Sequence, residues 1–204
     1  MNGRFFDLKK EKQDRMINAA LKIFALHGYR HASTDDIVKE AAISKGLLFH
    51  YFGSKLGVYT FIYDYSVRYM TLELKSAVSP VEKDMFEILK QTEQAKLQAL
   101  RGYPYMQQFL TRSMSEDVGE ALIAVEDMRN VLASHYERLQ AQMDFSSLPA
   151  GIDGRKLCKM MDFTIKGLMS ERFLDASFHP DMLYQEIVGY IDMMKLLTYK
   201  NIAH

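Results

Sequence analysis

The side chains best suited to bind a polyanion lie between residues 34 and 55. Residues 44–52 read Ser-Lys-Gly-Leu-Leu-Phe-His-Tyr-Phe, which combines a hydroxyl, an ammonium group, an imidazole and a phenol. The glycine among them would let a duplex approach the backbone closely, and the polar groups can donate hydrogen bonds to phosphates or base edges. A leucine in the same segment can contact a thymine methyl group. This combination predicts binding of nucleic acid.

These residues occupy defined positions if 44–52 is a helix capped by Ser44. Leu48 and Phe52 are four residues apart and therefore share the face that anchors the helix to the core. The opposite side carries the candidate DNA contacts, which are Ser44 at the cap, Lys45, Gly46, Leu47, His50 and Tyr51. Thr34 and Lys55 each fall in the first turn of a neighbouring predicted helix. Free N–H groups and the helix dipole favour a phosphate at such a position.

No catalytic or metal-binding arrangement accompanies this segment. His27 and His31 are four residues apart, but Gly28 interrupts the helix between them and prevents a helical metal pair. Asp35 and Asp36 are adjacent, so they splay apart on a helix and do not act as paired carboxylates. The HExxH, P-loop, GxSxG and CxxC motifs are absent from the sequence. We expect no enzymatic activity, no cofactor and no metal.

The charge of the 204-residue chain is unevenly distributed although its formal net charge is zero. Residues 1–55 carry ten basic and six acidic residues, a net charge of +4, which leaves 16 basic and 20 acidic residues, or −4, for the remainder. Such asymmetry is typical of a polyanion-binding part joined to an acidic one. The single cysteine, Cys158, excludes an intrachain disulfide and suits a small core residue. No signal peptide or membrane span is expected, which favours a cytoplasmic location.

Helical periodicity dominates the sequence and predicts an all-α fold of about nine helices. In the first helix, apolar residues recur at the spacing of one helical face; they are Ile17, Ala20, Leu21, Phe24 and Ala25. Glycines and serines set the bounds of the N-terminal helices, which are 10–27, 34–41, 44–52 and 54–77. The later helices are predicted at 79–102, 104–112, 115–143, 155–176 and 180–200. A Ser79–Glu82 capping box with Pro80 at the first position marks the start of the fifth.

Several segments together resemble the N-terminal domain of the TetR family of transcriptional regulators over residues 12–63. They read Ala-Ala-Leu-Lys-Ile-Phe (19–24), His-Gly-Tyr (27–29), Ser-Thr-Asp-Asp-Ile-Val (33–38) and Ala-Ala-Ile-Ser-Lys-Gly-Leu-Leu-Phe-His-Tyr-Phe-Gly-Ser-Lys (41–55). The resemblance implies a helix-turn-helix domain at 1–53 and a regulatory and dimerisation domain at 54–204, with 54–77 as the linking helix. It places DNA contacts on Thr34, Ser44, Lys45, Gly46, Leu47, His50, Tyr51 and Lys55. Phe49 departs from the family, which often has tyrosine there.

The resemblance also implies a homodimer that represses from a palindromic operator and is released by a small, hydrophobic ligand. The last two predicted helices, about 155–200, carry apolar residues on more than one stripe, as expected if one face packs inside the subunit and another against a partner subunit. Methionines and aromatic residues are the candidate pocket liners; they are Met85, Phe86, Leu89, Tyr103, Tyr105, Met106, Phe109, Met128 and Phe163. No buried charge pair can be identified from the sequence. The alternative is a DNA-binding interaction or architectural protein controlled by a protein partner.

Overall fold

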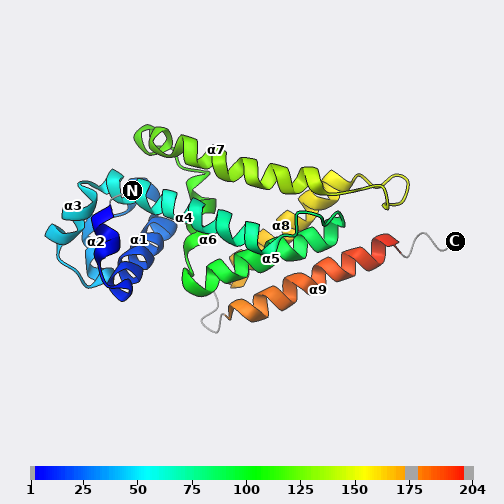
Figure 1. The fold of residues 1–204 in the computed structure, drawn as a ribbon, viewed down its shortest axis with the longest axis horizontal. Helices are drawn as coiled ribbons and strands as arrows, with labels where there is room; N and C mark the ends of the chain where they lie inside the picture. Colours follow the sequence, from blue (N-terminus) through cyan, green and yellow to red (C-terminus); the bar gives the residue numbers. More distant parts are fainter. Residues whose placement is uncertain (1–2, 173–178, 200–204) are drawn as a thin grey trace. The chain divides into compact units, whose positions relative to one another are not determined.

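A computed structural model describes residues 3–172 and 179–199, which form helices and connecting turns without a β-strand (Figure 1). The elements are η1 (Gly3–Asp7), α1 (Lys10–His31), α2 (Thr34–Ala41), α3 (Lys45–Phe52), α4 (Lys55–Ala77), α5 (Met85–Gly102), α6 (Met106–Ser113), α7 (Gly119–Gln142), α8 (Gly154–Arg172) and α9 (Pro180–Tyr199). The predicted all-α class is confirmed. Within the described ranges, no helix has the length and apolar character needed to cross a membrane.

Contacts divide the chain into two compact units. Unit 1 combines residues 1–72 with 99–135, and unit 2 combines 73–98 with 136–204. Helices α4, α5 and α7 each contribute residues to both units. Unit 1 therefore continues beyond residue 53, because α6 and the first part of α7 pack with the N-terminal helices. A functional boundary at residue 53 stays a prediction.

Local sequence signals account for α2 and α3, whose predicted positions are confirmed. The Ser33 hydroxyl accepts a hydrogen bond from Asp35 N at 3.1 Å, and the Ser44 hydroxyl accepts one from Leu47 N at 3.2 Å. Each serine thereby satisfies an amide at a helix start that has no intrahelical partner. The predicted interruption of the first helix at Gly28 is confirmed, since Gly28 has non-helical angles (φ +66°, ψ 176°). One further turn follows it, so that α1 as a whole ends at His31.

The predicted start of the fifth helix at Ser79 is also wrong, because Asp84 caps it instead. Its Oδ1 accepts a hydrogen bond from Phe86 N at 2.8 Å, and α5 begins at residue 85. The Ser79 amide donates to Gln91 Oε1 at 2.9 Å, and Glu82 N donates to Ser79 O at 3.3 Å. The segment before Asp84 is therefore a turn held by side chains, which removes the expected capping box.

Three other starts shift for similar local reasons. The predicted start at residue 115 moves to 119, because the Glu116 carboxylate accepts hydrogen bonds from the amides of Asp117 and Val118 and holds a turn there. The start at 104 moves to 106, where Met106 N donates to Tyr103 O at 3.0 Å. Helix α8 begins at 154 rather than 155. The predicted ends at 176 and 200 lie outside the described residues.

The core of unit 1 is an aromatic cluster contributed by α1, α4 and α6. Its members are Phe24, Tyr29, Tyr59, Tyr63 and Phe109, with neighbouring ring centroids 5.1–6.4 Å apart. All five side chains are buried. Edge-to-face and tilted ring contacts add to the stabilisation that burial provides. The cluster joins the helix before the α2–α3 pair to the first half of α4.

Unit 2 buries one apolar stripe of each of its last two helices, and α8 packs against α9. The buried residues are Leu157, Cys158, Met161, Ile165 and Leu168 on α8 and Leu183, Ile187 and Ile191 on α9. Their spacing follows one helical face. Cys158 is 8% exposed and is a core residue, as the sequence suggested.

Candidate nucleic-acid interface

Helix α3 is held by its buried face and leaves its other side at the surface. Leu48 is 1% exposed and belongs to the core of unit 1, and Phe52 packs partly buried against that core. The turn from α2 is tight, since Ala42 adopts a left-handed conformation (φ +51°) and Ile43 N donates to Val38 O at 3.0 Å. The α2–α3 pair thus has the helix-turn-helix connection that the sequence predicted.

The candidate contacts fall into two groups by exposure. Exposed are Ser44, Lys45, Gly46 and His50, and half-buried are Thr34, Leu47, Tyr51 and Lys55. A Cβ atom built on Gly46 would meet no other atom of the protein within 4 Å. Packing inside the protein therefore does not require glycine at this position. The space that the missing side chain leaves is open to a partner approaching α3.

Lys45 forms an ion pair across the α2–α3 turn. Its Nζ lies 2.8 Å from Asp35 Oδ1, and the two side chains are 52% and 68% exposed. Exposed pairs of this kind stabilise a protein only slightly. Lys45 can therefore exchange Asp35 for a DNA phosphate at little cost.

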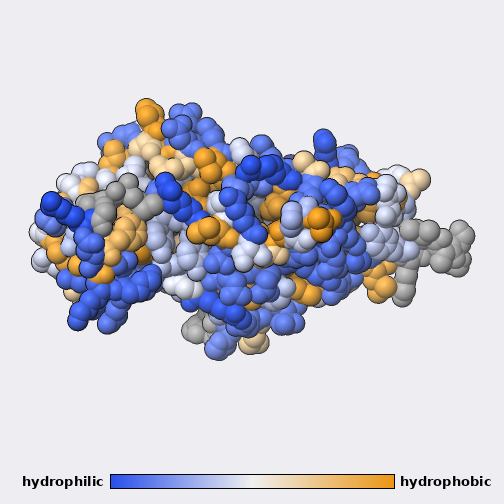
Figure 2. All heavy atoms as spheres, viewed as in Figure 1, coloured by the Kyte–Doolittle hydropathy of each residue, from blue (hydrophilic) through white to orange (hydrophobic). Residues whose placement is uncertain are grey.

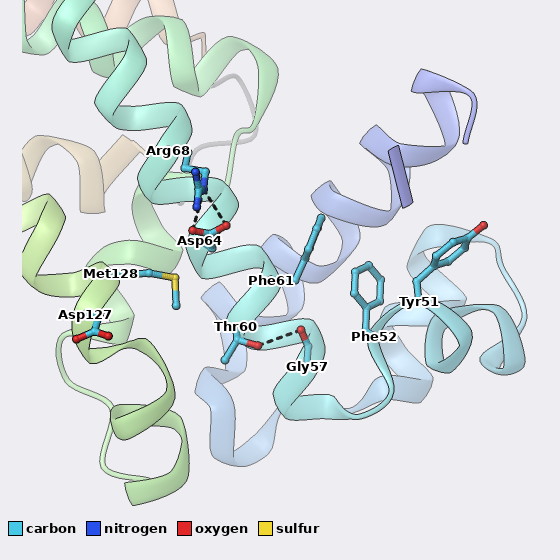
Figure 3. A pocket seen from close by; sticks show the side chains of 9 residues that line it. All are labelled: Tyr51, Phe52, Gly57, Thr60, Phe61, Asp64, Arg68, Asp127 and Met128. Carbon is cyan, nitrogen blue, oxygen red and sulfur yellow. Dashed lines mark hydrogen bonds and ion pairs between the residues drawn. The ribbon is translucent and has the colours of Figure 1, made fainter. Parts of the chain in front are cut away.

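Tyr51 is more enclosed than the sequence suggested. Its ring contacts His50 on one side, with centroids 5.0 Å apart, and Phe5 of η1 on another, at 5.8 Å edge to face. The side chains of Tyr51, Phe52 and Phe61 are drawn in Figure 3. The η1 segment was not predicted from the sequence, since residues 3–7 are too few to show a periodicity. The contact of Phe5 with Tyr51 exists only in the folded chain.

Lys55 has two protein partners that the sequence did not reveal. Its Nζ donates to Arg30 O at 3.2 Å and lies 4.7 Å from the centroid of the Tyr29 ring. Burial lowers the pKa of this ammonium group. Lys55 thereby ties the start of α4 to the end of α1. Its contact with a DNA phosphate stays a prediction.

Acidic residues around the start of α7 hold the last turn of α1. Tyr29 N donates to Glu116 Oε2 at 2.7 Å, the Tyr29 hydroxyl donates to Glu120 Oε1 at 2.6 Å, and Arg30 pairs with Asp117 at 3.1 Å. Burial and the Glu120 carboxylate raise the pKa of Tyr29, so this phenol stays a donor. We name these five residues the α1–α7 junction. It connects the base of the helix-turn-helix to α7 within unit 1.

A groove of 490 Å³ runs beside α4 in unit 1 (Figure 3). It is lined by Tyr51, Phe52, Gly57, Thr60, Phe61, Asp64, Arg68, Asp127 and Met128. Arg68 Nε donates to both carboxylate oxygens of Asp64 at 2.9 Å, as the dashed lines in Figure 3 show. Among the predicted pocket residues, Met128 lines this groove.

The other predicted pocket residues divide between the two units. Tyr103, Met106 and Phe109 are buried in unit 1, where Tyr105 is half-buried. In unit 2, Met85 and Phe86 are buried and Leu89 is half-buried. Phe163 requires a correction, because its side chain is 60% exposed on α8 and does not lie in an interior cavity. Its stripe on α8 faces outward, whereas the neighbouring Met161 and Ile165 face inward.

Unit 2 contains an ion pair with a buried carboxylate, which could not be identified from the sequence. Lys96 Nζ lies 2.7 Å from Glu93 Oε1, and the Glu93 side chain is only 4% exposed. The same ammonium group lies 6.0 Å from the centroid of the Tyr136 ring. A Glu and a Lys three residues apart usually mark a solvated helical face, so the sequence offered no reason to place this pair inside. Among the described residues, no group of three metal-ligating side chains is suitably placed.

Comparisons with known proteins support the N-terminal assignment. A family model described as "Bacterial regulatory proteins, tetR family" matches residues 16–59. The uncharacterised HTH-type transcriptional regulator YuxN of Bacillus subtilis is 44% identical over 59 residues, which span 27% of this chain and 20% of that protein. The HTH-type transcriptional regulator AcrR of Shigella flexneri is 22% identical over 201 residues, covering 92% of this chain and 91% of AcrR.

Solved structures share the fold along nearly the whole chain. A TetR family transcriptional regulator from Chloroflexus aurantiacus has a TM-score of 0.67 at 20% identity, covering 97% of this chain and 96% of that one. The fatty acid degradation regulator FadR from Bacillus halodurans has a TM-score of 0.57 at 16% identity, covering 90% and 95%. The sequence match and the shared fold agree: residues 16–59 match the N-terminal domain of the TetR family of transcriptional regulators, and the chain as a whole has the fold of such regulators.

Proposed function

We propose that this protein is a repressor that binds a palindromic DNA operator as a homodimer and is released by a small hydrophobic ligand. The observation that carries DNA binding is the exposed side of α3, where Lys45, the open surface at Gly46 and His50 lie together. In a helix-turn-helix, the second helix enters the major groove and its N-terminal residues contact base edges. The net charge of +4 on residues 1–55 attracts the phosphate backbone.

Selection from a random pool of double-stranded DNA tests this proposal and identifies the operator. We expect enrichment of a pseudo-palindrome whose half-sites are about one helical turn, roughly 34–36 Å, apart or somewhat more. Binding of the enriched DNA should weaken steeply as salt rises, because bound phosphates release counterions. A pool that shows no enrichment, with binding equally weak for all sequences, would contradict the proposal.

Dimerisation is supported by a second, outward apolar stripe on each of the last two helices. The exposed residues are Met160 and Phe163 on α8 and Met182, Tyr190, Met193, Leu196 and Leu197 on α9. They lie outside the buried stripes, as the predicted pairing of about 155–200 across a two-fold axis requires. Contiguous exposed apolar residues mark interaction surfaces in proteins. Two copies of the α8–α9 pair would cover both stripes in a four-helix bundle.

Charge placed on these stripes should separate the subunits. We expect the wild-type protein to sediment at twice the 23.6 kDa chain mass at micromolar concentration, and the Phe163→Glu/Met193→Glu variant at the chain mass. The buried carboxylates would lose hydration without gaining a partner. Ile123→Glu is the matched control, because Ile123 is 76% exposed on α7 in unit 1. A wild-type monomer at this concentration would contradict the proposed homodimer.

Release by a ligand requires that the ligand favour a conformation unable to bind DNA. We infer that helix α4 and the α1–α7 junction carry the ligand-induced change in conformation to the helix-turn-helix. Lys55 begins α4 and contacts both Tyr29 and Arg30 at the end of α1. The buried members of the predicted pocket set supply methionine and aromatic surface suited to a hydrophobic effector, such as an aromatic or fatty acyl compound. Thermal-shift titration with both classes tests this, since a ligand that binds only the folded state raises the melting temperature.

Control by a protein partner is the alternative, and one observation favours it. Ile123 and Val131 on α7 are 76% and 51% exposed, and Figure 2 shows apolar patches over the α7 region. If no compound shifts the melting temperature and Ile123→Glu/Val131→Glu abolishes regulation while DNA binding persists, the partner is a protein.

A further inference from the structure

The segment before α1 is firmly attached to the recognition helix, although nothing in the proposed function uses it. We propose that η1 is a second DNA-binding element, which places the Arg4 guanidinium on the phosphodiester backbone beside α3. This inference rests on the proposed DNA binding and adds a contact outside the helix-turn-helix.

Phe5 fixes the segment against the end of α3 and the start of α4. Its side chain is fully buried, and its ring centroid lies 4.9 Å from that of Phe61, 5.4 Å from Phe52 and 5.8 Å from Tyr51. Figure 3 shows those three partner rings along this side of the groove. A phenylalanine with no exposed surface and three aromatic neighbours from α3 and α4 is held in one place. The backbone on either side of it is therefore held as well.

Gln13 fastens the other end of the segment. Its Nε2 donates to Phe6 O at 3.0 Å and to Leu8 O at 2.7 Å, and the side chain is 8% exposed. These two carbonyls lie before the first turn of α1 and accept hydrogen bonds from the same side chain. The segment from residue 5 to residue 8 is thus bound at both ends to the helix-turn-helix.

The geometry of DNA places phosphates beside this segment. An α-helix is about 10–12 Å across with its side chains, and the major groove of B-DNA is about 12 Å wide. A recognition helix therefore fills the groove, and whatever lies immediately beside it faces the sugar-phosphate strands. Phe5 contacts Tyr51, so its neighbour Arg4 lies at the end of α3 that also carries His50.

Arg4 has the chemistry for this contact. It is exposed, and within residues 3–172 and 179–199 it takes part in no ion pair. Several other cations in the first 55 residues are paired, namely Lys10 with Asp14, Lys22 with Glu40, Arg30 with Asp117 and Lys45 with Asp35. The planar guanidinium matches a phosphate bidentately. Binding of a phosphate by Arg4 would break no existing ion pair.

Salt dependence of binding to the selected operator provides the test. We expect Arg4→Gln to lower the slope of log Kobs against log salt by about 1.8, because each of the two subunits loses one phosphate contact worth about 0.9. The substitution should weaken binding of all sequences to a similar extent. Arg4→Lys should keep the slope, because it keeps the charge. Arg138→Gln is the matched control, since Arg138 is an exposed arginine of unit 2.

A second pair of variants tests the attachment. Phe5→Ala should weaken binding at least as much as Arg4→Gln, because it also removes a ring that supports Tyr51. Adding Arg4→Gln to Phe5→Ala should cost no further affinity. Phe6→Ala should have a smaller effect than Phe5→Ala, because Phe6 is 40% exposed although its ring also contacts Phe5 and Phe61. A wild-type salt slope in Arg4→Gln, while Lys45→Ala lowers it, would overturn the role of η1 and leave the proposed function standing. Absence of salt-dependent DNA binding by the wild-type chain would instead overturn the proposed function itself.

Discussion

The Lys45→Ala/Tyr51→Ala variant should bind the selected operator about 100-fold more weakly than the wild type and with a shallower salt slope. Loss of a specific contact costs about 1–3 kcal/mol, and 1.4 kcal/mol corresponds to a factor of ten. Lys45 contributes charge from the first turn of α3. Its ion pair with Asp35 is exposed and therefore too weak to prevent Lys45 from binding a phosphate. Tyr51 contributes a hydroxyl from a ring supported by Phe5 and His50. Gel-shift titration at several salt concentrations measures both effects.

Two controls separate DNA contact from structural damage in this experiment. Tyr51→Phe keeps the ring that packs against Phe5 and removes only the hydroxyl, so it should lose affinity without losing stability. Lys156→Ala removes an exposed lysine of unit 2 and should leave both the affinity and the salt slope unchanged. Unchanged affinity and slope in the Lys45→Ala/Tyr51→Ala variant would show that α3 is not the recognition helix.

The Lys96→Met variant should melt about 10 °C below the wild type. Removing one partner of a buried ion pair costs about 3–5 kcal/mol, and 1 kcal/mol shifts the melting temperature of a chain of this size by roughly 2–4 °C. The Glu93 carboxylate is 4% exposed and lies 2.7 Å from the ammonium group, so Lys96→Met leaves a largely desolvated charge without its cation. Thermal unfolding followed by circular dichroism measures the change.

The pH dependence of this contribution has a definite sign. Burial lowers the pKa of Lys96, but the Glu93 carboxylate more than offsets this effect, so the pKa is raised above its ordinary value of 10.5. A raised pKa of a cation means that its contribution to stability is complete at neutral pH and is lost only as pH rises through the folded-state pKa. The melting temperatures of wild type and variant should therefore differ equally at pH 6 and pH 8.

Neighbouring substitutions supply the controls for the buried pair. Lys90→Met breaks pairs with Glu87 and with Asp192, which is 54% exposed, and should cost less than about 1 kcal/mol. Glu93→Gln/Lys96→Met removes both charges and should recover much of the lost stability. If Lys96→Met is no more destabilising than Lys90→Met, the pair does not stabilise the interior of unit 2.

Short-range chemistry made much of the helix-turn-helix predictable. Ser33 and Ser44 were expected to cap α2 and α3, and both do so through hydrogen bonds to amides two or three residues away. The prediction of a cap at Ser79 was wrong. Helix α5 begins after Asp84, whose carboxylate accepts a hydrogen bond from Phe86 N. Local patterns rank such alternatives poorly when each satisfies similar groups.

The sequence was enough to predict which residues belong to the candidate interface. It was not enough to predict the contacts that these residues make with distant parts of the chain. The spacing of Leu48 and Phe52 indicated which side of α3 is buried, and therefore which side remains for DNA. The contact of Phe5 with Tyr51 joins residues 46 positions apart, and the hydrogen bond from Tyr29 to Glu116 joins residues 87 positions apart. Neither contact leaves a periodic signal, because each depends on how separate helices pack.

By itself, the sequence determined that the chain is all-α, that residues 34–52 form a helix-turn-helix, and that each of the last two helices carries more than one apolar stripe. These properties follow from helical periodicity and from caps formed within a few residues. Tertiary structure alone decided that Lys55 contacts Arg30 and Tyr29, that η1 lies against α3, that Phe163 faces outward and that the Glu93 carboxylate is buried beside Lys96. In each case the outcome depends on which surfaces of distant helices meet, and burial then sets the strength of every charge and ring contact between them.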